Sequence, residues 1–234
     1  MTSNIYDRRR VNGPARSVEP VYIDAFEPIA FPDGLRNDGR SLDQLRPIYI
    51  KTGPLAAQQT FSSTAPSGSA YYEQGKIRRS HIRGADEKET AQILEQAIAP
   101  AIRLEAYPKA CIDAYVTVIE SDGKFATISA AINCISAALA DAGIELYDTV
   151  TSCSMSSDSS RWVADCSQSE EDASSCSLLV AYMPSADEIT YLLQNGKSTL
   201  DQTEQAVQAC TNSCTRVYAV ISHYLQSSMK QPGT

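Results

Sequence analysis

Two clusters of basic residues are the side chains of this sequence best suited to hold an anion. The longer cluster consists of Lys76, Arg78, Arg79, His81 and Arg83, and the shorter one of Arg8, Arg9 and Arg10. Such clusters contact nucleic-acid phosphates without reading the bases, and salt weakens the contacts. The alternative is ordinary solvated charge, because acidic residues follow the longer cluster and charged chain ends are commonly frayed. Both interpretations stay open at this point.

The residue types give little support for a metal-binding site or for nucleophilic catalysis. The seven cysteines stand at 111, 134, 153, 166, 176, 210 and 214, and the only histidines are His81 and His223. The spacing of Cys210 and Cys214 places both thiols on one face of a helix, which is unlike a zinc knuckle. No nucleophile-elbow, phosphate-loop or dinucleotide-binding string occurs. The sequence therefore predicts no metal site and no cofactor, with thiols kept reduced in a nuclear or cytoplasmic compartment.

Composition and charge restrict the partners of the chain. Its 234 residues are 43% hydrophobic and 21% charged, which is typical of a globular domain. Asp and Glu number 28 against 20 Lys and Arg, so the net charge is −8 and any nucleic-acid contact has to be local. No stretch is apolar over the length of a transmembrane helix, and the first residues lack the apolar region of a secretory signal.

Strands and helices alternate along the chain and would position these residues. Residues 1–35 are predicted to form an extended N-terminal arm and residues 36–230 one domain. Strands are predicted at 47–53, 68–75, 110–120, 147–154, 161–166, 177–183 and 188–194, with a turn at Asn195-Gly196. Helices are predicted from Asp86 to Leu104 with a kink at Pro100, at 125–143 and at 200–229.

The predicted helices differ in character. Residues 125–143 are nearly all small or apolar, which predicts a helix buried on almost every side. The last helix is amphipathic, with apolar residues at steps of three and four. The acidic string Ser169-Glu-Glu-Asp172 is interpreted as a solvated turn. This order of elements predicts an α/β or α+β fold with helices against a mixed sheet.

Several short strings resemble the RNase PH family. The opening of such domains is similar to Arg36-Asn-Asp-Gly-Arg40 followed by Leu45-Arg-Pro47, and the end of their buried helix is similar to Ala137-Ala-Leu-Ala-Asp-Ala-Gly-Ile144. Further strings resemble one subunit of the fungal RNA exosome ring, namely Asp7–Arg10 with Gly13-Pro-Ala15, and Tyr107-Pro-Lys109 with Ile112-Asp113. The resemblance covers about residues 36–230 and implies an RNase PH-like fold.

The resemblance also implies where catalytic groups would lie. Active members use inorganic phosphate to cleave RNA from its 3′ end, which requires phosphate donors and a carboxylate. The phosphate site falls at Lys124, Phe125, Ala126 and Thr127, where Phe125 and Ala126 replace the hydroxyl and guanidinium of the family. The acid site falls at Cys176 and Leu178, which cannot act as carboxylates. Both sites are therefore expected to be degenerate, with no catalytic residue.

The chain departs from the family after Gly75. Family members continue there with a strand that ends in a Gly-Pro pair and then with a further strand, whereas here Gly75 runs directly into Lys76. A central strand pair is therefore expected to be absent. Its loss would expose a sheet edge and apolar helix surface.

The resemblance implies a non-catalytic structural subunit of the eukaryotic exosome ring. Such a subunit supports 3′–5′ processing and degradation of rRNA, snoRNA and mRNA and lines part of the RNA path; the alternative is an active phosphorolytic 3′–5′ exoribonuclease. The expected partners are other RNase PH-like subunits in a hetero-hexameric ring, cap subunits of the S1/KH type and single-stranded RNA, with no membrane. The expected location is the nucleus, including the nucleolus, and the cytoplasm.

Overall fold

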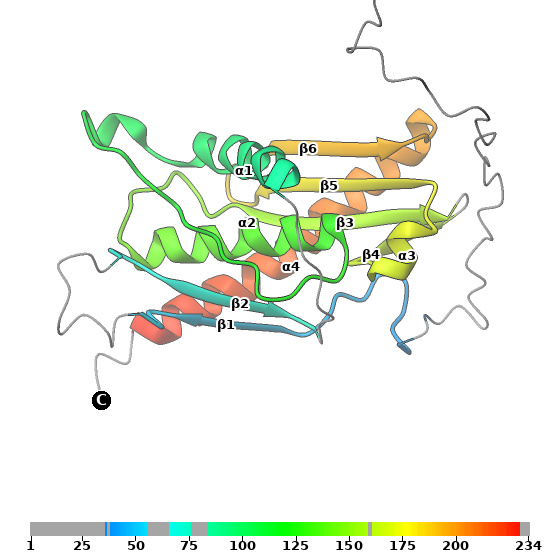
Figure 1. The fold of residues 1–234 in the computed structure, drawn as a ribbon, viewed down its shortest axis with the longest axis horizontal. Coiled ribbons are helices and arrows are strands. Elements are labelled where there is room, and N and C mark those ends of the chain that lie inside the picture. The colour runs from blue at the N-terminus through cyan, green and yellow to red at the C-terminus, as the bar shows by residue number, and fades with distance from the viewer. Residues whose placement is uncertain (1–35, 37, 56–65, 76–83, 159–160, 230–234) are drawn as a thin grey trace, which may run out of the picture.

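The computed structural model describes residues 36, 38–55, 66–75, 84–158 and 161–229. In this part of the chain a four-stranded sheet lies between helices, and a two-stranded sheet lies beside them (Figure 1). The expected α/β class is confirmed, although every pairing between the described strands is antiparallel instead of mixed. None of the helices found in these residues has the length and apolarity needed to cross a bilayer.

The elements alternate broadly as the sequence predicts. In chain order they are β1 (Ile48–Thr52), β2 (Ala70–Gln74), α1 (Gly84–Ile98), α2 (Lys124–Asp141), β3 (Thr151–Asp158), β4 (Arg161–Ala164), α3 (Gln168–Asp172), β5 (Cys176–Met183), β6 (Glu188–Gly196) and α4 (Leu200–Met229). Two short 3-10 turns lie at Ala99–Ala101 and Leu104–Ala106. The larger sheet has the order β4-β3-β5-β6, and β1 pairs only with β2.

Strand β5 is the centre of the core. All eight of its residues are buried, because helices cover both faces of the sheet. Leu179 and Ala181 pack with α1 and α2 on one face, and Leu178 and Val180 pack with α4 on the other. This double cover explains why β5 is a continuous apolar run from Leu178 to Met183 instead of an alternating pattern.

Helix α2 is buried as predicted, and its buried polar side chains bond to the backbone of β3 and of the residue just before it. Asn133 accepts a hydrogen bond from the Ser152 N–H at 2.8 Å and donates one to the Ser152 carbonyl at 3.1 Å. Ser136 donates to the Val150 carbonyl at 2.6 Å. Since β4 pairs only with the second half of β3, the first half has a free edge that α2 satisfies.

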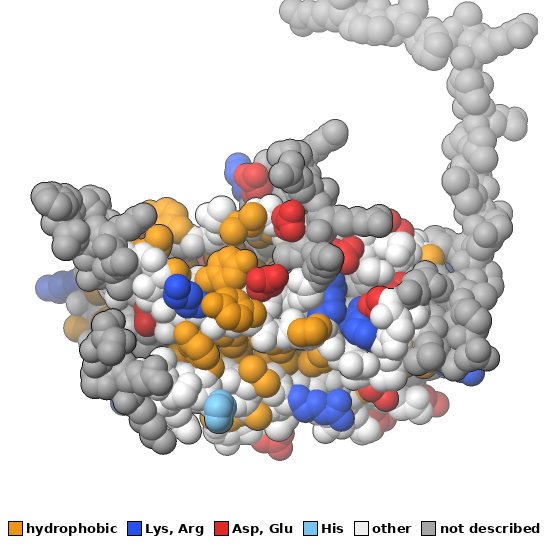
Figure 2. Space-filling model, turned by 90° about the horizontal axis from the view of Figure 1, so that it is seen from below, with side chains coloured by type: hydrophobic (Ala, Val, Ile, Leu, Met, Phe, Trp, Pro, Cys, Tyr) orange, Lys and Arg blue, Asp and Glu red, His pale blue; other side chains and the backbone are white. Residues whose placement is uncertain are grey.

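In the small sheet, side chains alternate between the inner and the outer face along each strand. Ile48, Ile50 and Tyr72 turn inward toward α4 and α2. Tyr49 and Tyr71 lie on the outer face, where their rings form an edge-to-face pair with centroids 6.1 Å apart. Seen from the side of β1 and β2, hydrophobic side chains gather near the middle of this face (Figure 2).

Three predicted boundaries differ for local reasons. The strand expected at 147–154 begins only at Thr151, because its pairing with β5 starts at Tyr182. Asn195 and Gly196 belong to β6 instead of a turn, because their pairing with β5 continues to Cys176. Helix α1 ends at Ile98, and Pro100 lies in the following 3-10 turn instead of kinking a longer helix.

The strand predicted at 110–120 is wrong. These residues, called the 110–120 segment below, form an irregular run between the turn at Leu104–Ala106 and α2. Their alternating β-branched pattern is that of a strand, but a strand also needs a partner edge for its backbone, and no described strand lies against them.

Candidate active site

The start of α2 is the place where the family resemblance puts a phosphate. The first backbone N–H groups of a helix have no partner within the helix, and the helix dipole attracts negative charge there. Here the Phe125 N–H donates to the carboxylate of Glu171, at 3.2 Å from Oε1 and 3.4 Å from Oε2. The anion position is therefore filled by a side chain of the same molecule.

Gly123 makes this approach possible. Its φ is +105°, and a Cβ atom at this position would lie 2.5 Å from Glu171 Oε2. The Gly123 carbonyl also accepts a hydrogen bond from Thr127 Oγ1 at 2.6 Å. The positive φ of this turn favours glycine, and a side chain here would also push the Glu171 carboxylate aside.

The four residues of the proposed phosphate site have other partners. Phe125 is buried in the core against α1 and β5, and Ala126 is buried as well. The Lys124 ammonium pairs with Glu89 of α1 at 3.2 Å on the surface, and the Thr127 hydroxyl contacts Ser121 at 2.7 Å. The structure brings these residues together at one helix start, but it directs none of their described side chains into an open anion pocket.

The acidic string after β4 is not a solvated turn, and that interpretation is wrong for two of its residues. It forms α3, in which Glu170 is buried and paired with the Arg36 guanidinium, at 2.8 Å from Nε to Oε1. Burial alone would raise the pKa of Glu170, but hydrogen bonds from Arg36 and Ser167 and the charge of Arg36 together outweigh it and hold that pKa below its ordinary value. Burial raises the pKa of Glu171, and of the three acidic residues of the string only Asp172 is exposed.

Asp165 organises a second buried ion pair next to α3. Its carboxylate accepts hydrogen bonds from Arg46 Nη2 at 2.8 Å and from Arg46 Nε at 3.0 Å. Arg40 lies 3.5 Å away, and Asp122 pairs with Arg46 from the other side at 3.1 Å. Burial alone would raise the pKa of Asp165, but the Arg46 hydrogen bonds and charge outweigh it and keep that pKa low.

The mostly buried side chains of this cluster, called the arginine cluster below, carry one more negative than positive charge. Its cations are Arg36, Arg40 and Arg46, and their ion-pair partners are Asp38, Asp122, Asp165 and Glu170. With one more carboxylate than guanidinium groups, the cluster has no cation left to attract a phosphate. In the sequence these arginines stand out only as part of a family string, because their main partners, Asp165 and Glu170, lie over 100 residues away in the chain.

The two positions of the acid site are buried. Cys176 is 2% exposed and accepts a weak hydrogen bond from Gln194, while Leu178 is fully buried against α4. Among the described residues, no hydrogen bond joins either of them to Lys124–Thr127. The structure thus places these two positions in the core of the sheet.

The two basic clusters lie outside the described residues, so Lys76, Arg78, Arg79, His81, Arg83, Arg8, Arg9 and Arg10 have no structural description. Within the part of the chain that is described, no group of three His, Cys, Asp or Glu side chains could hold a metal ion. All seven cysteines are free thiols.

Comparisons with known proteins agree with this fold. Residues 72–145 match the model of the 3′ exoribonuclease family, domain 1, also called RNase PH. The "Exosome complex component mtr3" of Schizosaccharomyces pombe is 30% identical over 259 aligned positions, which cover 94% of this chain and 95% of that protein. The human "Exosome complex component MTR3" is 29% identical, with 97% of both chains covered.

A solved structure supports the same architecture. The crystal structure of rice (Oryza sativa) Rrp46 superposes with a TM-score of 0.68 at 18% identity, over 84% of this chain and all of that one. The S. pombe protein has residues in the aligned region that this chain lacks. The 94% share of this chain is about 220 residues, so about 39 of the 259 aligned positions have no residue here.

Proposed function

This chain belongs to the RNase PH family and resembles its exosome component mtr3, and from this premise we propose that it is a non-catalytic structural subunit of the RNA exosome ring. In that role it supports 3′–5′ processing and degradation of RNA that another chain carries out. The RNAs concerned are rRNA, snoRNA and mRNA.

The observation that carries this proposal is the contact between Glu171 and the start of α2. Phosphorolysis needs a bound inorganic phosphate that attacks the terminal phosphodiester, and electrostatic stabilisation by fixed donors is usually the largest catalytic contribution. Here the donor at the helix start, the Phe125 N–H, is already bonded to a carboxylate. A phosphate would have to displace Glu171 and would meet its negative charge at close range.

The groups around that contact also argue against phosphorolysis. The arginine cluster is neutralised by its own carboxylates, so it offers no free guanidinium to a phosphate. Cys176 and Leu178 have no acidic group and lie in the core. Proton transfer to the leaving oxygen of RNA would need a titratable group in contact with it, and neither position provides one.

A structural role requires surfaces for neighbouring subunits. In the larger sheet β6 is an edge strand, and its Ile189 and Leu192 are exposed. The outer face of β1 and β2 adds the tyrosine pair of Tyr49 and Tyr71. Exposed edges and aromatic side chains are typical of surfaces that bind other proteins, and we propose other RNase PH-like ring subunits and S1/KH cap subunits as the partners.

The proposed RNA contacts come from the two basic clusters, which would touch phosphates of single-stranded RNA in the assembled ring. Seven free thiols agree with a reducing compartment, and we propose the nucleus with its nucleolus and the cytoplasm.

Reconstitution tests the proposal. The chain is combined with partner ring and cap subunits that carry no active nuclease, and the assembly is given single-stranded RNA with 10 mM phosphate. We expect co-elution of the chain with the ring and no release of nucleoside diphosphates. Release of nucleoside diphosphates by the chain alone would establish the active phosphorolytic enzyme instead, and a clean monomer with all partners present would contradict the role in the ring.

A further inference from the structure

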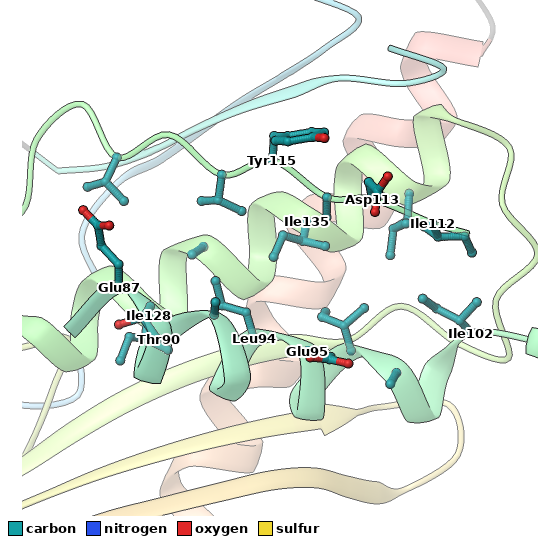
Figure 3. Close-up of a pocket in the computed structure, with 18 of the residues that line it drawn as sticks. Glu87, Thr90, Leu94, Glu95, Ile102, Ile112, Asp113, Tyr115, Ile128 and Ile135 are labelled. Carbon is teal, nitrogen blue, oxygen red and sulfur yellow. The ribbon is translucent and has the colours of Figure 1, made fainter. Parts of the chain in front are cut away.

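A groove of about 940 Å³ lies between α1 and the 110–120 segment, with α2 as its floor (Figure 3). Pockets that hold small organic ligands measure about 300–1,000 Å³, and this groove falls within that range. One end adjoins the start of α2 at Lys124, and the floor continues along that helix as far as Leu139. Most of the groove therefore lies away from the contact between Phe125 and Glu171.

The walls of the groove are mainly apolar. The lining residues of each helix recur at steps of three and four, so they share one helix face; they are Ala91, Leu94 and Ile98 on α1 and Ile128, Ala131, Ile135 and Leu139 on α2. The 110–120 segment adds Ile112, Val116 and Val118 on the opposite side. Since these side chains have no hydrogen-bonding group, the body of a ligand that fills the groove has to be apolar.

The 110–120 segment leaves apolar surface open to water at the mouth of the groove. Tyr115 is 92% exposed, Val116 and Val118 are exposed as well, and Leu104 is exposed at the far end. Soluble proteins seldom leave contiguous apolar surface of this kind open unless it binds something. An apolar ligand would remove part of this surface from water.

The charges along the rim select the sign of the ligand. Glu87 and Glu95 project from α1, and Asp113 belongs to the 110–120 segment (Figure 3). The cation of the lining is Lys124, and its ammonium already pairs with Glu89 at 3.2 Å. None of the ion pairs between described residues includes any of the three rim carboxylates. The rim is therefore negative, which favours a cation over a fatty acid, a nucleotide or another anion.

We propose that the groove binds a lipophilic cation, which is a small molecule with an apolar body and one protonated amine. The apolar body lies over the floor formed by α2, and the ammonium group lies at the rim beside Glu87, Glu95 or Asp113. A second copy of this chain docked groove to groove would instead bring two sets of the same carboxylates together. The inference stands whether or not the chain joins the exosome ring.

Four simple probes test the proposal on the full chain by calorimetry at pH 7. Decylamine, decanol and decanoate share a ten-carbon chain and differ in charge, and octylamine is two carbons shorter. We expect decylamine to bind one-to-one with a Kd of about 0.1 mM and octylamine about fifteenfold more weakly, because each buried CH₂ contributes about a factor of four. Decanoate should bind at least about tenfold more weakly than decylamine, with decanol between them.

Charge-neutral variants test the rim. The double variant Glu87→Gln, Glu95→Gln keeps the shape of the side chains, and we expect it to weaken decylamine at least about fivefold while decanol binding is unchanged. The control is Glu188→Gln, Glu204→Gln, which removes the same charge from exposed positions outside the groove. This control should bind both probes as the unmodified chain does.

A bulky side chain tests the location. Ala91 is exposed and lines the groove, whereas its neighbour Gln92 is exposed and does not. Ala91→Trp should fill part of the groove and weaken decylamine at least about tenfold, and Gln92→Trp should leave its Kd unchanged. If Ala91→Trp fails to fold, the glutamine variants still test the site.

Alkylation of Cys111 reports occupancy directly. Cys111 is exposed, lines the groove and donates its thiol hydrogen to Asp113 at 3.4 Å. At ten times the Kd about one site in ten stays empty, so decylamine should slow the alkylation about tenfold. Cys111→Ser identifies its share of the total alkylation.

Four results would overturn the proposal. Equal Kd values for decylamine and decanoate would show that charge is not recognised, and unchanged binding to the glutamine variant would show that the rim is not involved. An unreactive Cys111 in the unmodified monomer would show that the chain covers the groove itself. A dimer in gel filtration with an unreactive Cys111 would assign the groove to a second copy.

Discussion

At the scale of single residues, Asp165 is the side chain on which most of the arginine cluster depends. It is buried, and its φ of +52° is a conformation that asparagine also tolerates. Asp165→Asn therefore keeps the shape and removes the charge, which leaves Arg46 and Arg40 without their shared partner. Loss of one partner of a buried ion pair costs about 3–5 kcal/mol, and we expect a decrease of that size in the free energy of unfolding by urea. Asp172→Asn, at an exposed position, is the control and should change it by less than about 0.5 kcal/mol.

The same substitution should also change how the free energy of unfolding depends on pH. The pKa of Asp165 is lower in the folded chain than its ordinary 3.8, so the unfolded chain binds more protons in acid. The ion pair then stabilises the protein above about pH 4, and this stabilisation is lost as the pH falls through the folded pKa. We expect the free energy of unfolding of Asp165→Asn to fall less steeply from pH 5 to pH 2 than that of the unmodified chain. Parallel curves would contradict the assignment.

For Glu171 we expect stability to depend on pH in the opposite direction. Burial raises its pKa above the ordinary 4.5, so the folded chain binds the proton more tightly and stability falls as the pH rises through this range. Glu171→Gln removes the charge, and its amide oxygen can still accept the Phe125 N–H. We expect the free energy of unfolding of this variant at pH 7 to be at least as large as that of the unmodified chain, measured by urea unfolding. A large loss would mean that the negative charge itself holds α2.

At the scale of elements, Asn133 makes two of the hydrogen bonds that join α2 to β3. Asn133 is the partner of the Ser152 N–H on the free edge of β3. Asn133→Leu keeps the volume and leaves that buried donor unpaired, which costs about 2 kcal/mol in the free energy of unfolding. Asn195→Leu, at an exposed position of β6, is the matched control for urea unfolding. Equal effects of the two changes would contradict the role of Asn133.

The elements also show what the sequence can and cannot predict. The buried helix α2 and the amphipathic α4 follow from composition and periodicity, which are local properties of the chain. The 110–120 segment has an equally clear strand pattern, but pairing depends on a neighbouring edge that pattern does not report. The interpretation of Glu170 and Glu171 as a solvated turn is wrong for a related reason. Their partners Arg36 and Phe125 lie far away in the sequence. The site is formed by contacts between residues far apart in the sequence, and a local sequence pattern does not reveal such contacts.

At the scale of the whole molecule, RNA contact should depend on the longer basic cluster, since the net charge of the chain is −8. Replacement of Arg78, Arg79 and Arg83 by Ala in the assembled ring should reduce the log–log salt slope of single-stranded RNA binding by about 1.5 to 2, because each lost phosphate contact contributes about 0.7. The loss should be equal for all RNA sequences.

The control for this triple variant removes the same charge elsewhere. Arg161, Lys197 and Arg216 are exposed in the described part of the chain, and their replacement by Ala should leave the slope unchanged. If both triple variants bind RNA with the slope of the unmodified ring, the longer cluster is ordinary solvated charge.

Titration of the isolated chain with inorganic phosphate, followed by calorimetry at pH 7, tests most directly whether its own carboxylate fills the family's phosphate site. Because Glu171 occupies the start of α2 and the arginine cluster is neutralised internally, we expect no saturable binding up to about 10 mM phosphate. One-to-one binding with a Kd of about 1 mM or tighter, lost in Lys124→Ala, would contradict the account and restore the phosphorolytic enzyme as the function of this chain.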